Sequence, residues 1–287
     1  MAKRYNIEVP EKELSPEELT AYKRRENAIF SLSKQNSSFH ASLLKHETAQ
    51  AYLSGRGITP TTIEKWNLGW ATNGFFTGRI TFPIQYVSGE VCGFTGRTME
   101  KDLQPKYKNS PEDDYFKKSE LLFGLYHTKN QITRMNRCYI VEGQTDVLQM
   151  DQLGYGNTVA PSGTALTVKQ IRLIKRFTKN IVLLLDADAP GIKAAIKNIS
   201  PLLTEQVNLR IIVLHKGEDP DSFIRKSELG KATQYINNEE IDFIEFKTQQ
   251  FNIWFNLRWN GGSIYWFFVT FGEYKFHKKT LQTSVIQ

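Results

Sequence analysis

Carboxylates follow two apolar runs in the middle of the chain. The first run, Cys138–Val141, leads into Glu142, and Asp146 follows shortly after. The second run, Ile181–Leu185, leads directly into Asp186-Ala-Asp188. Charged side chains are seldom buried without a partner, so acids that converge at one place would need a cation between them. Oxygen ligands of this kind suit Mg²⁺ or Mn²⁺ rather than zinc, and the sequence therefore predicts a divalent-metal site.

A third group of acids follows a later apolar stretch. Residues 209–214 have the composition of a further strand, and Asp219 and Asp221 come soon after it. These two carboxylates could complete the metal site. An Asx-type turn before a helix explains them equally well, so the residues alone leave both interpretations open.

The elements that would position these acids alternate between strand and helix over residues 138–225. Short apolar runs bounded by polar residues are typical of buried strands in a parallel sheet. Strands are expected at 138–142, 157–160, 181–185 and 209–214, and helices near 145–153, 167–177 and 190–204. Repeated strand–helix connections predict parallel strands with right-handed crossovers, and ligands bind at the carboxyl edge of such sheets. We therefore predict an α/β fold whose acids meet at that edge.

The chain before residue 136 has a different pattern. Residues 1–25 are polar and charged and are expected to form a tail or linker, with a plausible helix start at Ser15-Pro-Glu-Glu. The elements expected next are helices over 26–55 and 59–66 and strands over 79–84 and 91–94, with a hairpin turn at Ser88-Gly89. This mixture predicts an α+β N-terminal subdomain.

Basic and aromatic residues are interleaved in the turn-rich segment 105–118. Lys106 and Tyr107 lie near its start, and Phe116 is followed by Lys117-Lys118. Such residues suit phosphate contacts combined with base stacking, and the formal net charge of +7 agrees with a polyanionic partner. A solvated loop with anchoring aromatic rings, together with ordinary variation in surface charge, accounts for the same observations.

The composition excludes several classes of protein. A chain of 287 residues with 40% hydrophobic content can bury a core and can form two domains. Neither Cys92 nor Cys138 belongs to a CxxC pair, so no zinc site and no disulfide framework are expected. There is no apolar run of membrane-spanning length and no signal-peptide pattern at the start. We expect a cytoplasmic protein that does not contact membranes.

The composition changes abruptly at about residue 250. Residues 250–287 are rich in Trp, Phe and Tyr, contain one acid, Glu273, and show neither the helical nor the strand period. A hydrophobic partner-binding tail, a pair of strands, or the translated out-of-frame end of a truncated gene would each produce such a segment. The abruptness of the change favours the last interpretation.

Several motifs of the chain, Val141-Glu142-Gly143, Gly93–Arg97 and Gly217–Asp221 among them, resemble those in the catalytic core of bacterial DnaG-type primases. Val141-Glu142-Gly143 with Asp146, and Asp186-Ala-Asp188 with Gly191, are similar to the TOPRIM module shared by primases, topoisomerases and related nucleases. Further similar stretches, in the order and spacing of the primases, are Gly78–Ile84, Gly93–Arg97, Pro105–Tyr107, Asn109–Glu112, Leu122–Tyr126 and Gly217–Asp221. The resemblance extends from about residue 26 to about residue 247.

The resemblance implies synthesis of short RNA primers on single-stranded DNA from ribonucleoside triphosphates, in cooperation with the replicative helicase. It implies that catalytic Mg²⁺ or Mn²⁺ is bound by Glu142, Asp186 and Asp188, with Asp146, Asp219 and Asp221 in support. In two-metal chemistry one cation lowers the pKa of the primer 3′-hydroxyl, and the other stabilises the triphosphate and the leaving pyrophosphate. Glu142 could instead be a general base.

The family's basic surface for template and nucleotide also has counterparts here. They are Arg79, Arg97, Lys106, Tyr107, Asn109, Lys117 and Lys118. This resemblance favours the nucleic-acid interpretation of the segment 105–118 over the solvated loop.

The composition and the resemblance together divide the chain. The expected parts are a tail over 1–25, an N-terminal subdomain with a basic surface over 26–135, a TOPRIM subdomain over 136–230, the start of a helical region over 231–249, and the atypical segment 250–287. We expect the family's N-terminal zinc-binding module and C-terminal helicase-binding domain to be absent, which could impair primer synthesis. The alternatives are a TOPRIM nuclease or topoisomerase-like enzyme and a non-catalytic DNA-binding remnant of a primase. A topoisomerase would need a tyrosine nucleophile in a further large domain.

Overall fold

The computed structural model describes residues 15–100, 102–163, 165–185, 199–215, 217–228 and 230–246. Its contacts divide the chain into one unit up to Glu240 and a second unit from Ile241. The segment 250–287 and most of the helix predicted over 190–204 lie outside the described residues. Of the helices in the described ranges, none is long and apolar enough to cross a membrane.

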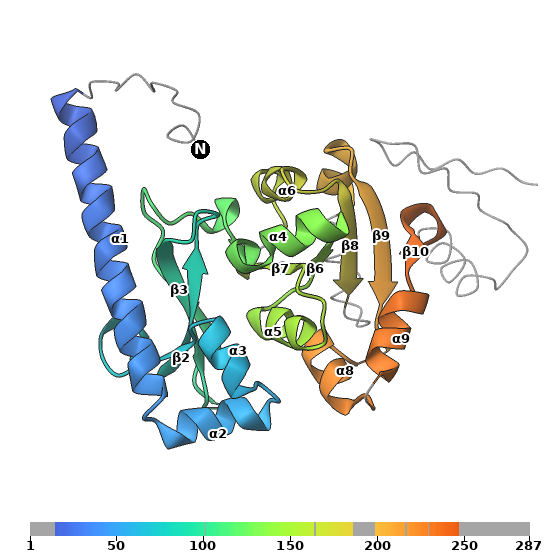
Figure 1. Ribbon diagram of the computed structural model, residues 1–287, viewed down its shortest axis with the longest axis horizontal. Coiled ribbons are helices and arrows are strands. Elements are labelled where there is room, and N and C mark those ends of the chain that lie inside the picture. Colours follow the sequence, from blue (N-terminus) through green and yellow to red (C-terminus); the bar gives the residue numbers. More distant parts are fainter. Residues whose placement is uncertain are drawn as a thin grey trace, which may run out of the picture. The chain divides into compact units, whose positions relative to one another are not determined.

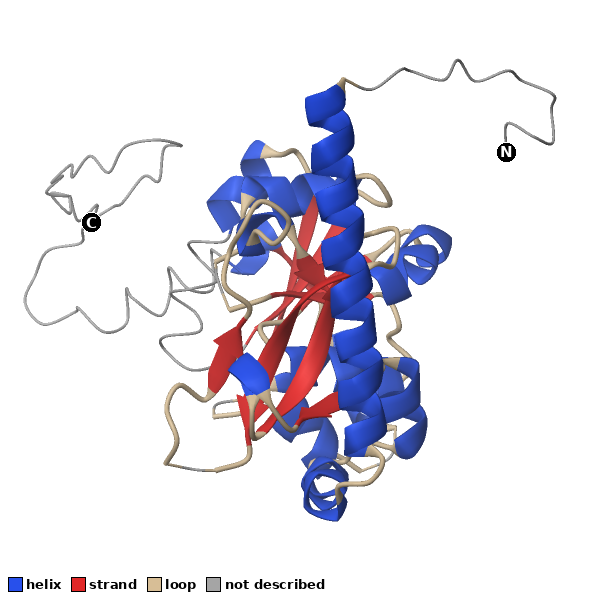
Figure 2. Ribbon diagram, turned by 90° about the vertical axis from the view of Figure 1, so that its left-hand side faces the viewer, coloured by secondary structure: helices blue, strands red, loops and turns tan. Residues whose placement is uncertain are grey.

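The first unit begins with three helices and a four-stranded antiparallel sheet. The helices are α1 (Pro16–Leu43), α2 (Glu47–Gly55) and α3 (Pro60–Lys65), and the strands are β1 (Gly69–Ala71), β2 (Arg79–Gln85), β3 (Val91–Thr98) and β4 (Tyr107–Asn109). A 3₁₀ turn, η2 (Gly74–Phe76), separates β1 from β2. The strands pair in the order β1-β2-β3-β4, which confirms the predicted hairpin. The long helix α1 lies along this sheet, as Figures 1 and 2 show.

Helix α1 begins at the predicted start signal Ser15-Pro-Glu-Glu. The Ser15 hydroxyl accepts a hydrogen bond from the Glu18 backbone N–H at 3.2 Å, and the Glu18 carboxylate accepts one from the Ser15 backbone N–H at 2.9 Å. This capping box, followed by Pro16 as the first helical residue, satisfies the backbone donors at the helix start. The helix start expected at Ser15 is therefore confirmed, and residues 16–25 form the first part of α1.

The rest of the first unit is a second sheet with its connecting helices. The strands are β5 (Leu122–Phe123), β6 (Cys138–Ile140), β7 (Thr158–Pro161), β8 (Asn180–Leu185) and β9 (Asn208–Val213). The helices are α4 (Leu125–Met135), α5 (Gln144–Gln152), α6 (Val168–Lys175), α8 (Pro220–Lys226) and α9 (Lys231–Asn238), and the 3₁₀ turn η3 (Lys118–Glu120) precedes β5. Strand β10 (Ile241–Asp242) belongs to the second unit.

Within the first unit this sheet has the order β9-β8-β6-β7-β5. Strand β6 pairs in parallel with β7 and β8, and β8 pairs in parallel with β9, which confirms the predicted parallel sheet and the α/β fold class. The edge strand β5 pairs antiparallel with β7, although it comes from the part of the chain predicted as the N-terminal subdomain. The two predicted subdomains therefore share a sheet.

The two sheets also share one hydrophobic core. Phe123 of β5 stacks on Trp66 with ring centroids 5.3 Å apart, and it meets Phe82 of β2 edge to face at 6.2 Å. These three rings and Leu184 of β8 are at most 1% exposed and belong to one buried cluster. Because aromatic side chains bury large apolar areas, this contact explains why the described contacts join both sheets in a single unit.

A histidine packs against the same aromatic cluster. The His127 ring lies 4.6 Å from the Trp66 ring, and burial, with a contribution from Lys65, lowers the pKa of His127 to about 4. The folded chain therefore keeps this imidazole neutral at a pH where the unfolded chain protonates it. Between about pH 6.5 and pH 4 the unfolded state binds the extra proton, so stability falls as the pH falls through this window.

We predict that His127→Phe removes this pH dependence. A phenyl ring retains the contact with Trp66 and cannot take up a proton. Urea unfolding should show that, between pH 7 and pH 4.5, the free energy of unfolding falls by about 2 kcal/mol more in the wild-type chain than in the variant. The difference arises because the folded state resists protonation of the partly buried imidazole. An equal fall in the free energy of unfolding in both proteins would contradict the prediction.

Helix α8 is attached to the N-terminal helices by a buried ion pair. The Arg56 guanidinium, just after α2, donates to the Asp221 carboxylate, which is 1% exposed. Arg225 contacts the same carboxylate at 3.3 Å, and Gln149 of α5 donates to it at 3.2 Å. A buried charge is tolerated only with such partners, so Asp221 connects three segments that are distant in the sequence.

We predict that Arg56→Met lowers the free energy of unfolding by about 3 kcal/mol, because it leaves a buried carboxylate with only part of its compensation. The matched control is Lys169→Met, which removes a cation from an exposed pair with Glu120 and should change stability by less than about 0.5 kcal/mol. Urea unfolding at pH 7 measures both. Equal effects would show that the Asp221 charge does not need Arg56.

Candidate functional site

A hollow of about 270 Å³ lies where the first sheet meets the loops that follow β6 and β7. Three acids line it, namely Glu142, Asp146 and Asp219. The basic and polar side chains at its wall include Arg56, Arg97, Lys106, Tyr107 and Asn109. The hollow thus brings together predicted metal ligands and predicted nucleotide-contacting residues.

The start of α5 determines where the first acids lie. Strand β6 ends at Ile140, Glu142 follows it, and Gly143 caps α5. The Asp146 carboxylate accepts a hydrogen bond from the Gly143 backbone N–H at 2.9 Å and another from the Asp221 backbone N–H at 3.2 Å. Asp146 therefore joins the start of α5 to the start of α8, which places the loop after β9 beside Glu142.

Asp219 caps the next helix and lines the hollow. Its carboxylate accepts a hydrogen bond from the Ser222 backbone N–H at 2.7 Å, as an Asx-type cap does. Burial opposes ionisation, but the hydrogen bonds from Ser222 and the nearby charges of Arg56 and Arg225 together hold the pKa of Asp219 below its usual value. The carboxylate is therefore charged at neutral pH. The turn interpretation and the ligand interpretation of this residue are compatible.

The remaining predicted acids are placed differently. Asp221 is directed to Arg56 and Arg225 and is not among the residues that line the hollow. Asp186 and Asp188 lie outside the described residues. The strand that leads to them, β8, is parallel to β6, with Ile140 paired to Leu183, so both strands end at the same edge of the sheet.

The donor set of the hollow fits a hard divalent cation. Glu142, Asp146 and Asp219 offer carboxylate oxygens, and neither cysteine lines the hollow. No group of three or more His, Cys, Asp or Glu side chains that could hold a metal was found in the described ranges, which do not include Asp186 and Asp188. The acids that can be described therefore account for only part of the predicted site.

Two of the predicted basic residues are buried and hold the wall of the hollow. Arg79 donates to the backbone carbonyls of Gly96, Pro105 and Lys106, which attaches the segment before β4 to β3. Arg97 donates through Nε to the Tyr52 hydroxyl at 2.9 Å and through Nη1 to the Tyr107 hydroxyl. Both arginines are at most 6% exposed, so their charges act mainly on the protein around them.

Arg97 also lies over two aromatic rings. Its guanidinium carbon is 5.1 Å from the ring centroid of Tyr107 and 5.8 Å from that of Tyr52. Burial raises the pKa of the Tyr107 hydroxyl, although Arg97 acts in the opposite direction. Tyr107 is therefore a neutral phenol held in place by a cation, and its position in the wall depends on Arg97.

Lys106 is the exposed cation at this wall. Its backbone carbonyl is used by Arg79, while its side chain is exposed and lines the hollow. Lys117 and Lys118, which were predicted to act with it, do not line this hollow. Of the predicted basic residues, Lys106 is therefore the best placed to contact a phosphate here.

Sequence reasoning missed several residues of this wall, among them Arg56, Thr95 and Gln144. Thr95 lies inside the Gly93–Arg97 motif, and Gln144 lies between Glu142 and Asp146. Their positions next to predicted site residues were the available signal. Their roles depend on contacts between strands and helices that the sequence does not display.

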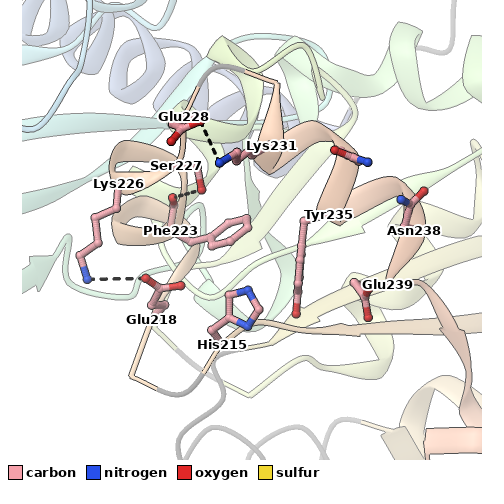
Figure 3. A pocket seen from close by; sticks show the side chains of 11 residues that line it. His215, Glu218, Phe223, Lys226, Ser227, Glu228, Lys231, Tyr235, Asn238 and Glu239 are labelled. Atoms are coloured by element: carbon pink, nitrogen blue, oxygen red, sulfur yellow. Dashed lines mark hydrogen bonds and ion pairs between the residues drawn. The ribbon is translucent and has the colours of Figure 1, made fainter.

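A second hollow, of about 540 Å³, lies between α8, α9 and the residues after β9 (Figure 3). His215, Phe223 and Tyr235 form its aromatic side. Its two lysines are already paired, Lys226 with Glu218 at 3.7 Å and Lys231 with Glu228 at 2.8 Å. Among the described residues that line it, this larger hollow therefore offers no excess of unpaired cations for a polyanion.

Two family models match the chain in the regions that form the smaller hollow. The N-terminal domain of the DNA primase catalytic core matches residues 73–129, and a Toprim-like domain matches residues 139–224. The DNA primase of Aquifex aeolicus is 34% identical over 270 residues, which cover 83% of this chain and 53% of the relative. The DNA primase of Halalkalibacterium halodurans is 29% identical, with 92% of this chain and 50% of the relative covered. The chain thus spans about half the length of these relatives.

Solved structures agree with these matches. The zinc-binding and RNA polymerase domains of Aquifex aeolicus primase superpose with a TM-score of 0.74 at 31% identity, covering 91% of this chain and 73% of that one. A DnaG primase catalytic domain bound to single-stranded DNA superposes with a TM-score of 0.73 at 28% identity, covering 80% and 83%. The resemblance seen in the motifs is confirmed, and the chain belongs to the DnaG-type DNA primase family and contains its catalytic core.

Proposed function

We propose that this chain synthesises short RNA primers on single-stranded DNA from ribonucleoside triphosphates. The observation that carries the proposal is the hollow that is lined both by Glu142, Asp146 and Asp219 and by Lys106, Tyr107 and Asn109. Nucleotidyl transfer needs this combination, because a polyanionic substrate must be bound while charge develops at the reacting oxygens. Membership of the primase family makes primer synthesis the natural form of that reaction.

Glu142, Asp186 and Asp188 are the proposed ligands of catalytic Mg²⁺ or Mn²⁺, with Asp146 and Asp219 in support. Bound cations would activate the primer 3′-hydroxyl and stabilise the leaving pyrophosphate. Asp221 has a different proposed role, since its carboxylate already meets two guanidinium groups. It holds Asp146 and the loop of Asp219 in place through its backbone N–H and its ion pairs.

The basic side of the hollow would bind the polyanions. Lys106 is proposed to contact a phosphate of the nucleotide or template, and Asn109 to offer its amide to the same substrate. Arg79 and Arg97 are proposed to support these contacts from behind, because both are buried and bonded to the wall. The exposed Lys117 and the partly exposed Lys118 would extend the binding surface for single-stranded DNA. A helicase partner, as in the family, is part of the proposal.

We predict that the purified chain forms labelled oligoribonucleotides on single-stranded DNA in the presence of Mg²⁺ or Mn²⁺. Glu142→Gln, Asp186→Ala and Asp188→Ala should each lower the rate by at least about 100-fold, because each removes a proposed metal ligand. Glu228→Gln, in an exposed surface pair, is the matched acid control and should retain the wild-type rate.

If each of the three single variants still synthesises primers at the wild-type rate, the assignment of these acids as metal ligands is refuted. If the wild-type chain makes no product with metal, template and nucleotides present, the proposed activity of this chain is wrong. DNA cleavage in place of synthesis would favour a TOPRIM nuclease.

We also predict that Lys106→Ala weakens binding of the chain to single-stranded DNA or to a ribonucleoside triphosphate by about fivefold at low salt. The loss should shrink as salt rises, because a phosphate contact releases counterions. Lys169→Ala is the control, since this lysine is paired with Glu120 and is not among the residues that line the hollow. Fluorescence anisotropy across a salt series measures both. Equal binding by the two variants would exclude a phosphate contact by Lys106.

A further inference from the structure

A chain of side-chain hydrogen bonds crosses the wall of the hollow. Gln144 Nε2 donates to Thr95 Oγ1 at 3.1 Å, and Thr95 Oγ1 donates to Asn109 Oδ1 at 2.6 Å. Asn109 Nδ2 then donates to the backbone carbonyl of Ser162 at 3.2 Å. The four residues come from α5, β3, β4 and the loop after β7, and all of them line the hollow.

The direction of these bonds is determined by the chemistry of the groups. A threonine hydroxyl has one proton, and Gln144 already donates to the Thr95 oxygen, so the Thr95 proton is directed to Asn109. The Asn109 amide cannot be reversed, because its oxygen would then face the Ser162 carbonyl oxygen. Asn109 Nδ2 carries two protons and Ser162 accepts one of them, so the second can be donated to a ligand in the hollow.

Burial makes this arrangement stiff. Thr95 is 1% exposed and Gln144 is 5% exposed, so neither can exchange its partner for bulk water. Without the Thr95 hydroxyl, the Gln144 amide would lose its acceptor and the Asn109 oxygen would lose its donor. The hydroxyl therefore controls the orientation of the Asn109 amide.

We infer that Thr95 is a positioning residue for nucleotidyl transfer, whose hydroxyl holds the Asn109 amide with one N–H directed to the incoming ribonucleoside triphosphate. The inference rests on the proposed function, because Asn109 contacts substrate only if the hollow binds nucleotide. Gln144 supports Thr95 by donating to it, and it also ties the residues after Glu142 to the first sheet. The expected consequence is tighter nucleotide binding rather than a faster chemical step.

The test compares Thr95→Val with Thr81→Val in the full chain. Thr81 is the matched control because it lies in the neighbouring strand β2, is fully buried, and its hydroxyl has no hydrogen-bond partner within the described residues. Thr95→Val should raise KM for the nucleotide about tenfold with kcat changed by less than about threefold. Thr95→Ser should restore the wild-type KM, and Thr81→Val should retain it. Thr95→Ala replaces Thr95→Val if the latter does not fold.

A double-mutant cycle with Asn109→Ala separates positioning from general support of the fold. If Thr95 acts through Asn109, Thr95→Val should have no further effect on KM in the Asn109→Ala background. An undiminished effect in that background, or equal effects of Thr95→Val and Thr81→Val, would overturn the inference.

The dissociation constant for a non-hydrolysable ribonucleoside triphosphate with Mn²⁺ is measured for the same variants. If the wild-type chain binds this nucleotide but makes no primer, the proposed function fails. The same double-mutant cycle, measured as dissociation constants, then still tests whether Thr95 acts through Asn109. If the wild-type chain does not bind the nucleotide, both are overturned.

Discussion

The buried ion pair between Arg56 and Asp221 is the constraint on which the geometry of the hollow depends. Asp221 is 1% exposed, so its charge must be compensated inside the protein, and Arg56, Arg225 and Gln149 provide that compensation. The Asp221 backbone N–H in turn donates to Asp146, which caps α5 beside Glu142. One buried charge thus links the N-terminal helices, α8 and the start of α5, and these segments surround the acids of the hollow.

The same network divides the acids by their surroundings. Asp221 faces guanidinium groups and contributes little negative charge to the hollow. Glu142, Asp146 and Asp219 line the hollow, and Asp219 stays ionised because hydrogen bonds from Ser222 and nearby arginines outweigh the effect of burial on its pKa. Carboxylates collected in this way repel one another, which favours occupation by a cation. Asp219 and Asp221 therefore differ although they are close in the sequence, since Asp221 is paired with guanidinium groups and Asp219 lines the hollow.

Much of the fold could be predicted from the sequence because its signals are local. The apolar runs before Glu142 and Asp186 correspond to β6 and β8, with ends that differ by one or two residues. The antiparallel strand β5 could not be predicted, because its two residues make no pattern and their pairing with β7 depends on the packing of Phe123 against Trp66 and Phe82. The lining of the hollow could be predicted where residue type alone suggests chemistry, as at Glu142. It was not predictable for Thr95 and Gln144, whose bond joins residues 49 positions apart.

These long-range contacts bear on how the two predicted subdomains work together. In a chain with a flexible joint, Lys106 on one subdomain and Glu142 on the other would meet only part of the time. Here the bond between Thr95 and Gln144, the bond from Asn109 to Ser162 and the aromatic contacts of Phe123 all cross between the two sheets. A preorganised site does not have to order its groups when a ligand binds, and these contacts hold the two sheets together in the folded chain. The acids and cations of the hollow are held in place by the folded chain itself, and the ion pair between Arg56 and the buried Asp221 is part of that packing.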